Sequence, residues 1–148
     1  MQARLNPMET APGAYEAVRT VETYIQRCGL EKPLIELVKM RASQINGCAF
    51  CLDMHSHNAR KHGETEQRLY LLNAWRESSL YSPRERAALA WTEAVTRIAE
   101  TGAPDADYEA LRAHFTPVEI VNLTTLIGTI NLWNRLAISF RTPHPARR

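Results

Sequence analysis

The chain has 148 residues, of which 45% are hydrophobic and 23% are charged, a composition typical of one globular domain and not of a disordered or fibrous protein. The net charge is only +2, and no segment interleaves basic with aromatic residues, so we expect no nucleic-acid partner. The N-terminus lacks the apolar core of a signal peptide, and the longest apolar stretch, residues 118–140, contains Glu119, Arg135 and several asparagines, which argues against a membrane span. We therefore expect a soluble, cytoplasmic protein without a membrane partner.

The pattern of apolar residues predicts an all-α bundle of about six main helices in one domain, residues 1–148. Residues 1–13 are predicted to form an extended N-terminal arm, and residues 141–148 a flexible tail. Between them, helices are predicted at residues 14–28, 33–45, 48–62, 64–77, 83–100 and 117–140, with a short one at 107–114.

Local signals support several of these helices. On the first helix, one apolar stripe is expected to be buried, and it consists of Val18, Val21, Ile25 and Cys28. Cys28 would then be an inert thiol in the core. Two later starts place a hydroxyl cap, a proline and a glutamate in order: Ser82-Pro83-Arg84-Glu85 and Thr116-Pro117-Val118-Glu119. Residues 121–130 are rich in strand-favouring Thr, Ile and Val, but no second strand is available to pair with them, so a helix is predicted. The three tryptophans are expected to be core or interface anchors.

The cysteines direct attention to one segment. Three cysteines are too few, and odd in number, for a secreted disulfide scaffold. Cys48 and Cys51 form a Cys-x-x-Cys pair at a predicted helix start, and His55 follows. At about 100° per residue, Cys51 lies about 60° from Cys48 around the helix, with His55 between them. All three side chains therefore share one helix face, with His55 one turn from Cys51.

This grouping suits redox chemistry. The thiolate, not the thiol, attacks peroxides and disulfides, and both a helix N-terminus and a neighbouring imidazole favour the thiolate. A second thiol nearby converts a sulfenic acid into a disulfide. The segment is therefore predicted to be a redox-active dithiol. The helix terminus favours Cys48 as the reactive thiolate, whereas the histidine spacing favours Cys51.

Other interpretations use the same residues. The pair can be incidental and simply buried. The two cysteines with His55 and His57 resemble a zinc ligand set, but His57 lies about 200° around the helix from His55, and His62 lies about 10 Å along the axis. A thioredoxin fold needs βαβ units, and haem attachment needs a histidine where Leu52 stands. We therefore expect no metal and no cofactor, with zinc as the second interpretation.

Glu36 lies on the preceding predicted helix, and by itself it would be expected to be exposed or paired with Lys39 or Arg41. In combination, the order glutamate, Cys-x-x-Cys and histidine resembles the AhpD-like branch of the carboxymuconolactone decarboxylase superfamily, on these residues: Glu36, Cys48, Cys51 and His55. The resemblance continues through residues 71–77, 81–87 and 130–135, and so covers most of the chain.

The resemblance implies an all-helical fold, a peroxidase or thiol–disulfide cycle, and assembly as a homotrimer or homohexamer. It implies that Glu36 acts through His55 on Cys51, that Cys51 attacks a hydroperoxide, and that Cys48 closes the disulfide. A dithiol or a protein thiol would then serve as reductant. Phe50 departs from the best-known alkylhydroperoxidases, which have a histidine between the cysteines, and phenylalanine cannot transfer a proton.

Three functions follow as hypotheses. The first is a thiol-dependent peroxidase or disulfide oxidoreductase in antioxidant defence, with Cys51, Cys48, His55 and Glu36 as its catalytic residues. The second is a non-enzymatic redox sensor or adaptor, in which the same disulfide alters a binding surface. The third is a helical module stabilised by zinc. Lactone decarboxylation, known in the same superfamily, ranks last because it does not need two cysteines.

Overall fold

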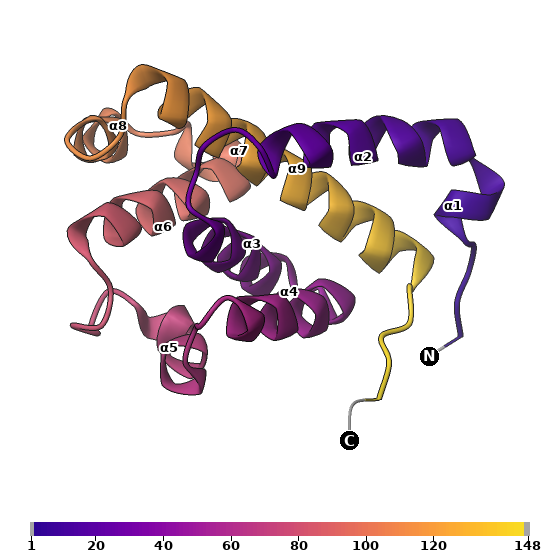
Figure 1. The fold of residues 1–148 in the computed structure, drawn as a ribbon. Helices are drawn as coiled ribbons and strands as arrows, with labels where there is room; N and C mark the ends of the chain where they lie inside the picture. Colours follow the sequence, from indigo (N-terminus) through magenta and orange to yellow (C-terminus); the bar gives the residue numbers. More distant parts are fainter. Residues whose placement is uncertain (1, 147–148) are drawn as a thin grey trace.

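The computed structural model describes residues 2–146, and within that range it contains helices and turns but no strand (Figure 1). The all-α prediction is therefore confirmed. The elements are α1 (Pro7–Thr10), α2 (Pro12–Ile25), α3 (Lys32–Asn46), α4 (Ala49–Lys61), α5 (Glu66–Leu71), the 3₁₀ helix η1 (Leu72–Ala74), α6 (Pro83–Thr96), α7 (Ile98–Thr101), α8 (Asp105–Arg112) and α9 (Pro117–Phe140). No helical segment in this range combines the length and the apolar character that a bilayer crossing requires.

The described chain has nine α-helices, instead of the six main helices and one short helix predicted, because one predicted helix is divided and the N-terminal arm contains a further short helix. The predicted helix over residues 83–100 breaks at Arg97, whose φ of −106° and ψ of 37° are not helical, into α6 and α7. The predicted helix over residues 64–77 becomes α5, η1 and a turn. There the guanidinium of Arg86 donates hydrogen bonds to the carbonyls of Trp75 and Ser78, at 2.9 and 3.0 Å. These bonds occupy carbonyls that a longer helix would have used.

The N-terminal arm is not wholly extended, in contrast to the prediction. The Asn6 side chain accepts a hydrogen bond from the backbone N–H of Met8 and caps the short helix α1. The backbone N–H of Arg4 donates to the carbonyl of Phe140 at 3.0 Å. The arm therefore lies against the end of α9, so the two ends of the described chain are on the same side of the molecule (Figure 1).

The capping-box predictions are confirmed at both positions. Ser82 caps α6 and Thr116 caps α9, and in each case the glutamate three residues later bonds back to the cap. Helix α9 spans residues 117–140, as predicted, despite its strand-favouring composition. Within it, the hydroxyls of Thr124, Thr125 and Thr129 each bond to the carbonyl four residues earlier, at 2.8 Å. The threonine hydroxyls are therefore satisfied inside the helix, and no strand partner is needed.

Helix α3 is the centre of the fold, because it packs against α4, α6 and α9. All ten residues from Leu34 to Ser43 are consequently buried, including three that carry charge. Buried charges must be paired, and each of them is: Glu36 with His55, Lys39 with Glu22, and Arg41 with Glu93.

The prediction for the apolar stripe on α2 is only partly right. Ile25 is fully buried, whereas Val21 is 38% exposed and Cys28 is half-buried. Apart from the neighbouring α1, α2 packs chiefly on α9, so only a narrow face is covered. That face brings Glu22 inward, where it meets Lys39.

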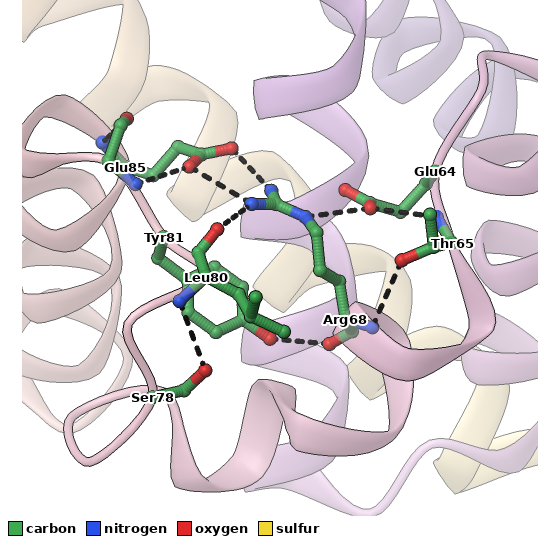
Figure 2. Close-up of polar contacts among 8 residues, drawn as sticks. Glu64, Thr65, Arg68, Ser78, Leu80, Tyr81 and Glu85 are labelled. Carbon is green, nitrogen blue, oxygen red and sulfur yellow. Dashed lines mark hydrogen bonds and ion pairs between the residues drawn. The ribbon is translucent and has the colours of Figure 1, made fainter.

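A polar cluster connects α5 to the start of α6 (Figure 2). The Arg68 guanidinium lies between two carboxylates, 2.8 Å from Glu64 and 2.5 Å from Glu85. It also donates to the carbonyl of Leu80 and lies 4.8 Å from the ring centre of Tyr81, whose hydroxyl donates back to the Arg68 carbonyl. This cluster holds the turn after η1 in place through the bonds at Leu80 and Tyr81.

Candidate active site

The two cysteines lie at the junction between α3 and α4. Gly47 ends α3 in the left-handed conformation, with φ of 71°. Cys48 is the N-cap of α4, and its sulfur accepts a hydrogen bond from the Cys51 N–H at 3.4 Å. The two sulfurs are joined as a disulfide, with the Cα atoms 5.4 Å apart. The predicted helix start at Cys48 is confirmed, and both cysteines are 1% exposed.

Glu36 in α3 and His55 in α4 form a buried pair. The Glu36 Oε2 atom is 2.8 Å from His55 Nδ1, and the two side chains are 6% and 5% exposed. The pairing of Glu36 with Lys39 or Arg41, expected from Glu36 considered alone, does not occur, because those cations bind other carboxylates. With Nδ1 engaged by the carboxylate, Nε2 is the ring nitrogen left to accept or donate a proton.

A cavity of about 570 Å³ opens beside this pair, and Cys51, His55 and Glu36 all contribute to its wall. Its apolar wall comes from α2, α4, α9 and the N-terminal arm: Pro7, Met8, Tyr15, Phe50, Met54, Trp133, Leu136 and Ala137. Tyr15 and Trp133 meet edge-to-face, with ring centres 5.1 Å apart. Trp133, expected to be a core or interface anchor, therefore also forms part of the wall of this cavity.

A second ion pair lines the same cavity. Lys39 is 2% exposed, and its ammonium binds the Oε1 atom of Glu22. The Gln26 side chain donates to that same oxygen at 2.9 Å. Burial raises the pKa of the Glu22 carboxyl, but the charge and hydrogen bond of Lys39, the bond from Gln26 and the charge of His55 outweigh it. The pKa of Glu22 consequently lies below its ordinary value of 4.5, so this carboxyl is ionised at neutral pH.

Sequence reasoning did not find Glu22 or Lys39 as site residues. Glu22 lies on a helix whose apolar stripe suggested a different inward face, and no local spacing connects it to the cysteines. The only available signal was Lys39 itself, a charge in the middle of an apolar helix that must find a partner when buried.

A further cavity, of about 430 Å³, lies on the other side of the cysteines. Cys48 contributes to its wall, together with Phe50 and residues 141–144 after α9. Cys51 belongs to the wall of the first cavity and Cys48 to that of the second, whereas Phe50, Ala137 and Thr142 line both. The disulfide thus lies between two cavities, and the predicted tail borders both of them. Residues 147–148 of that tail lie outside the described residues.

The other histidines differ in their relation to the two cavities, and His144 contributes to the wall of the second one. His62 contributes to the wall of the first cavity, whereas His57 lines neither cavity. Over residues 2–146, no three His, Cys, Asp or Glu side chains are grouped closely enough to hold a metal ion.

A model of the carboxymuconolactone decarboxylase family matches residues 11–94 of the 148, a span that contains both cysteines, His55 and Glu36. The chain belongs to this family. The uncharacterized protein YdfG of Bacillus subtilis is 43% identical over 139 residues, which cover 94% of this chain and 95% of the relative.

Solved structures place the chain in the AhpD-like branch of the carboxymuconolactone decarboxylase family. A protein of unknown function from Agrobacterium tumefaciens, described as a putative antioxidant defence protein AhpD, matches with a TM-score of 0.96 and 52% identity, over 99% of this chain and 100% of that one. A debrominase matches with a TM-score of 0.81 and 18% identity, over 94% of this chain and 75% of its own. The latter shows a shared fold only. The predicted family resemblance is confirmed.

Proposed function

We propose that this AhpD-like protein is a thiol-dependent peroxidase that reduces hydroperoxides through the Cys48–Cys51 dithiol in antioxidant defence. One observation carries the proposal. Cys51, joined to Cys48, shares a cavity with His55, and the buried carboxylate of Glu36 lies 2.8 Å from Nδ1 of that histidine. A dithiol beside a histidine oriented by a carboxylate has the parts that an activated sulfur nucleophile requires.

In the first half of the cycle, His55 takes the proton of Cys51, and Glu36 stabilises the resulting imidazolium. The Cys51 thiolate attacks the terminal oxygen of the hydroperoxide and the O–O bond breaks. Cys51 becomes a sulfenic acid, and the departing alkoxide takes the proton from His55 and leaves as an alcohol. The Cys48 thiol then attacks the sulfenic sulfur, which releases water and forms the disulfide.

In the second half, an external dithiol or protein thiol attacks Cys48, and Cys51 leaves as the thiolate. Departure of Cys51 is favoured because the better-stabilised thiolate is the better leaving group. His55, which shares the cavity with Cys51, stabilises the Cys51 thiolate. The second cavity, beside Cys48, supports an approach that does not pass through the hydroperoxide cavity. A second donor thiol then attacks the donor sulfur of the Cys48–donor disulfide, so that Cys48 leaves as the thiolate and takes up a proton. The donor leaves as a disulfide, and both protein thiols are restored.

The test is consumption of cumene hydroperoxide with dithiothreitol as donor. Cys51→Ser is expected to abolish turnover. Cys48→Ser, first reduced and then freed of dithiothreitol, is expected to consume one equivalent of hydroperoxide and stop at a sulfenic acid, which a dimedone probe traps on Cys51. Cys28→Ser is the matched control because Cys28 is the free cysteine, outside the disulfide, and it should turn over like the wild type. Equal rates in all four proteins would contradict the proposal.

The same proteins separate the alternatives. A redox sensor or adaptor would form the disulfide with peroxide but would show no sustained turnover with any dithiol, and its binding to a partner would change on oxidation. A zinc-stabilised module would retain about one zinc per chain after purification and would lose thermal stability with a chelator. Phe50 cannot transfer a proton between the two cysteines, so a modest turnover rate is compatible with the proposal.

A further inference from the structure

We propose that two asparagines, Asn46 at the end of α3 and Asn134 in α9, are positioning residues for Cys48. Their side chains hold the turn that carries Cys48, so that its sulfur stays beside Cys51 even when the disulfide is open. The inference rests on the proposed function, because it concerns the dithiol that this function uses. Neither asparagine belongs to the wall of either cavity, so their role is to position Cys48 and not to contact the hydroperoxide.

The turn between α3 and α4 receives little support from packing at its centre. Gly47 is exposed and left-handed, and among the described residues no atom beyond its chain neighbours lies within 4 Å of the point that a Cβ would occupy. The backbone holds Cys48 through one bond, from the Cys48 N–H to the Ser43 carbonyl at 3.0 Å. The place of Cys48 therefore depends on how firmly the last turn of α3 is held.

Two asparagines of α9 hold that last turn. The Asn46 amide donates to the Oδ1 atoms of Asn134 and Asn131, at 2.8 and 2.9 Å. Asn134 donates in turn to the Ser43 hydroxyl at 3.0 Å. Asn134 thus binds both Ser43, whose carbonyl holds Cys48, and Asn46, which directly precedes the glycine of the turn.

These bonds are buried and fixed in direction. Ser43 and Asn134 are both 0% exposed. The Asn131 amide donates to the Ile127 carbonyl at 2.9 Å and to the Thr96 hydroxyl at 3.1 Å, so its oxygen is the atom left to face Asn46. A buried polar group that loses its partner is costly. The turn therefore cannot move away from α9 without leaving several polar groups unsatisfied.

Holding the turn matters more in the reduced protein than in the oxidised one. When the disulfide is formed, the S–S bond itself keeps Cys48 beside Cys51. When it is open, only the turn does so, and a looser turn lowers the effective concentration of one thiol at the other. The disulfide then becomes easier to reduce. Its closure also becomes slower: in that step the Cys48 sulfur bonds to the sulfenic sulfur of Cys51, the S–O bond breaks, and the hydroxyl leaves as water with the Cys48 proton.

The first measurement is the equilibrium of the dithiol with reduced and oxidised glutathione, followed by thiol alkylation and mass spectrometry in a Cys28→Ser background. Asn46→Ala and Asn134→Leu should each lower the equilibrium constant for forming the disulfide about tenfold, which is about 30 mV. A bond that stabilised the oxidised and reduced folded proteins equally would leave this constant unchanged. A purely structural role therefore predicts no shift.

Asn122→Leu is the matched control. Asn122 is a buried asparagine of the same helix, 3% exposed, and it also accepts one bond and donates another: from the Tyr24 hydroxyl at 2.8 Å and to the Cys28 carbonyl at 3.2 Å. Those partners lie in α2 and in the turn after it, away from the dithiol turn. Asn122→Leu should lose thermal stability but keep the wild-type constant within twofold.

Asn46→Ala protects the test against misfolding, because Asn46 is only half-buried and its loss leaves the core side chains in place. If Asn46→Ala keeps the wild-type constant, or if Asn122→Leu shifts it as much, the inference is wrong.

Over-oxidation separates this inference from the proposed function. With excess hydrogen peroxide, slower closure leaves the Cys51 sulfenic acid open to a second peroxide molecule, which converts it to sulfinic acid. Asn46→Ala should form about tenfold more sulfinic acid per turnover than the wild type and Asn122→Leu, and equal amounts would contradict the claim about closure. If the glutathione equilibrium shifts as expected but the wild type consumes no hydroperoxide, the proposed function fails and the positioning role stands.

Discussion

Replacing Glu36 by glutamine removes the negative charge beside His55 and keeps a side chain of nearly the same size. The carboxylate and the imidazole are 2.8 Å apart and nearly fully buried, so little solvent is present to compensate for the lost charge. A hydrogen bond to a charged group contributes about 1.5–3 kcal/mol, and one between neutral groups about 0.5–1.5 kcal/mol. The difference, about 1–2 kcal/mol, corresponds to a rate reduced about 5- to 30-fold.

The step to measure is oxidation of the reduced dithiol by hydroperoxide under single-turnover conditions. Stopped-flow tryptophan fluorescence can follow it, because Trp133 lines the cavity that contains Cys51. His55→Gln removes the proton acceptor itself and should cost about 100-fold or more. Glu36→Gln should therefore fall between the wild type and His55→Gln.

The control is Glu109→Gln, because Glu109 is exposed on α8 and pairs only with the neighbouring Arg112 on the surface. It should react at the wild-type rate. Thermal unfolding of each variant shows whether the fold is retained. If Glu36→Gln reacts within twofold of the wild type while His55→Gln is strongly impaired, the idea that Glu36 acts through His55 is refuted.

Two predictions concern stability. Leu123→Ala should lower the free energy of unfolding by about 3–5 kcal/mol in denaturant titrations, because Leu123 is fully buried in the core. Leu132 lies on the same helix but is 43% exposed, so Leu132→Ala should lower it by less than about 0.5 kcal/mol. Similar losses in the two variants would contradict the packing described. Burial raises the pKa of Glu93, but hydrogen bonds from one indole and two guanidinium groups outweigh it and bring that pKa below 4.5. Its contribution to stability is therefore complete above pH 4.5 and is lost as the pH falls through the folded value. The stability gap between the wild type and Glu93→Gln should narrow below pH 4.5, and a gap independent of pH would refute this account.

Much of the helical architecture could be read from local patterns. The capping boxes at Ser82 and Thr116 depend on residues three apart, and both helices begin there. The end of the helical segment after η1 could not be predicted, because it depends on contacts with another segment, the bonds from Arg86 to the carbonyls of Trp75 and Ser78.

The dithiol segment shows the same division. That Cys48, Cys51 and His55 share one face follows from helix geometry within eight residues, and the sequence by itself was enough to place them together at the start of a helix. Only the tertiary structure decided which carboxylate pairs with which basic side chain. Glu36 pairs with His55 and Glu22 with Lys39 because α3 is enclosed by other helices, so each buried charge had to take the partner that a neighbouring helix presented. The two cavities beside the disulfide arise in the same way, from side chains that only the packing of distant helices brings together.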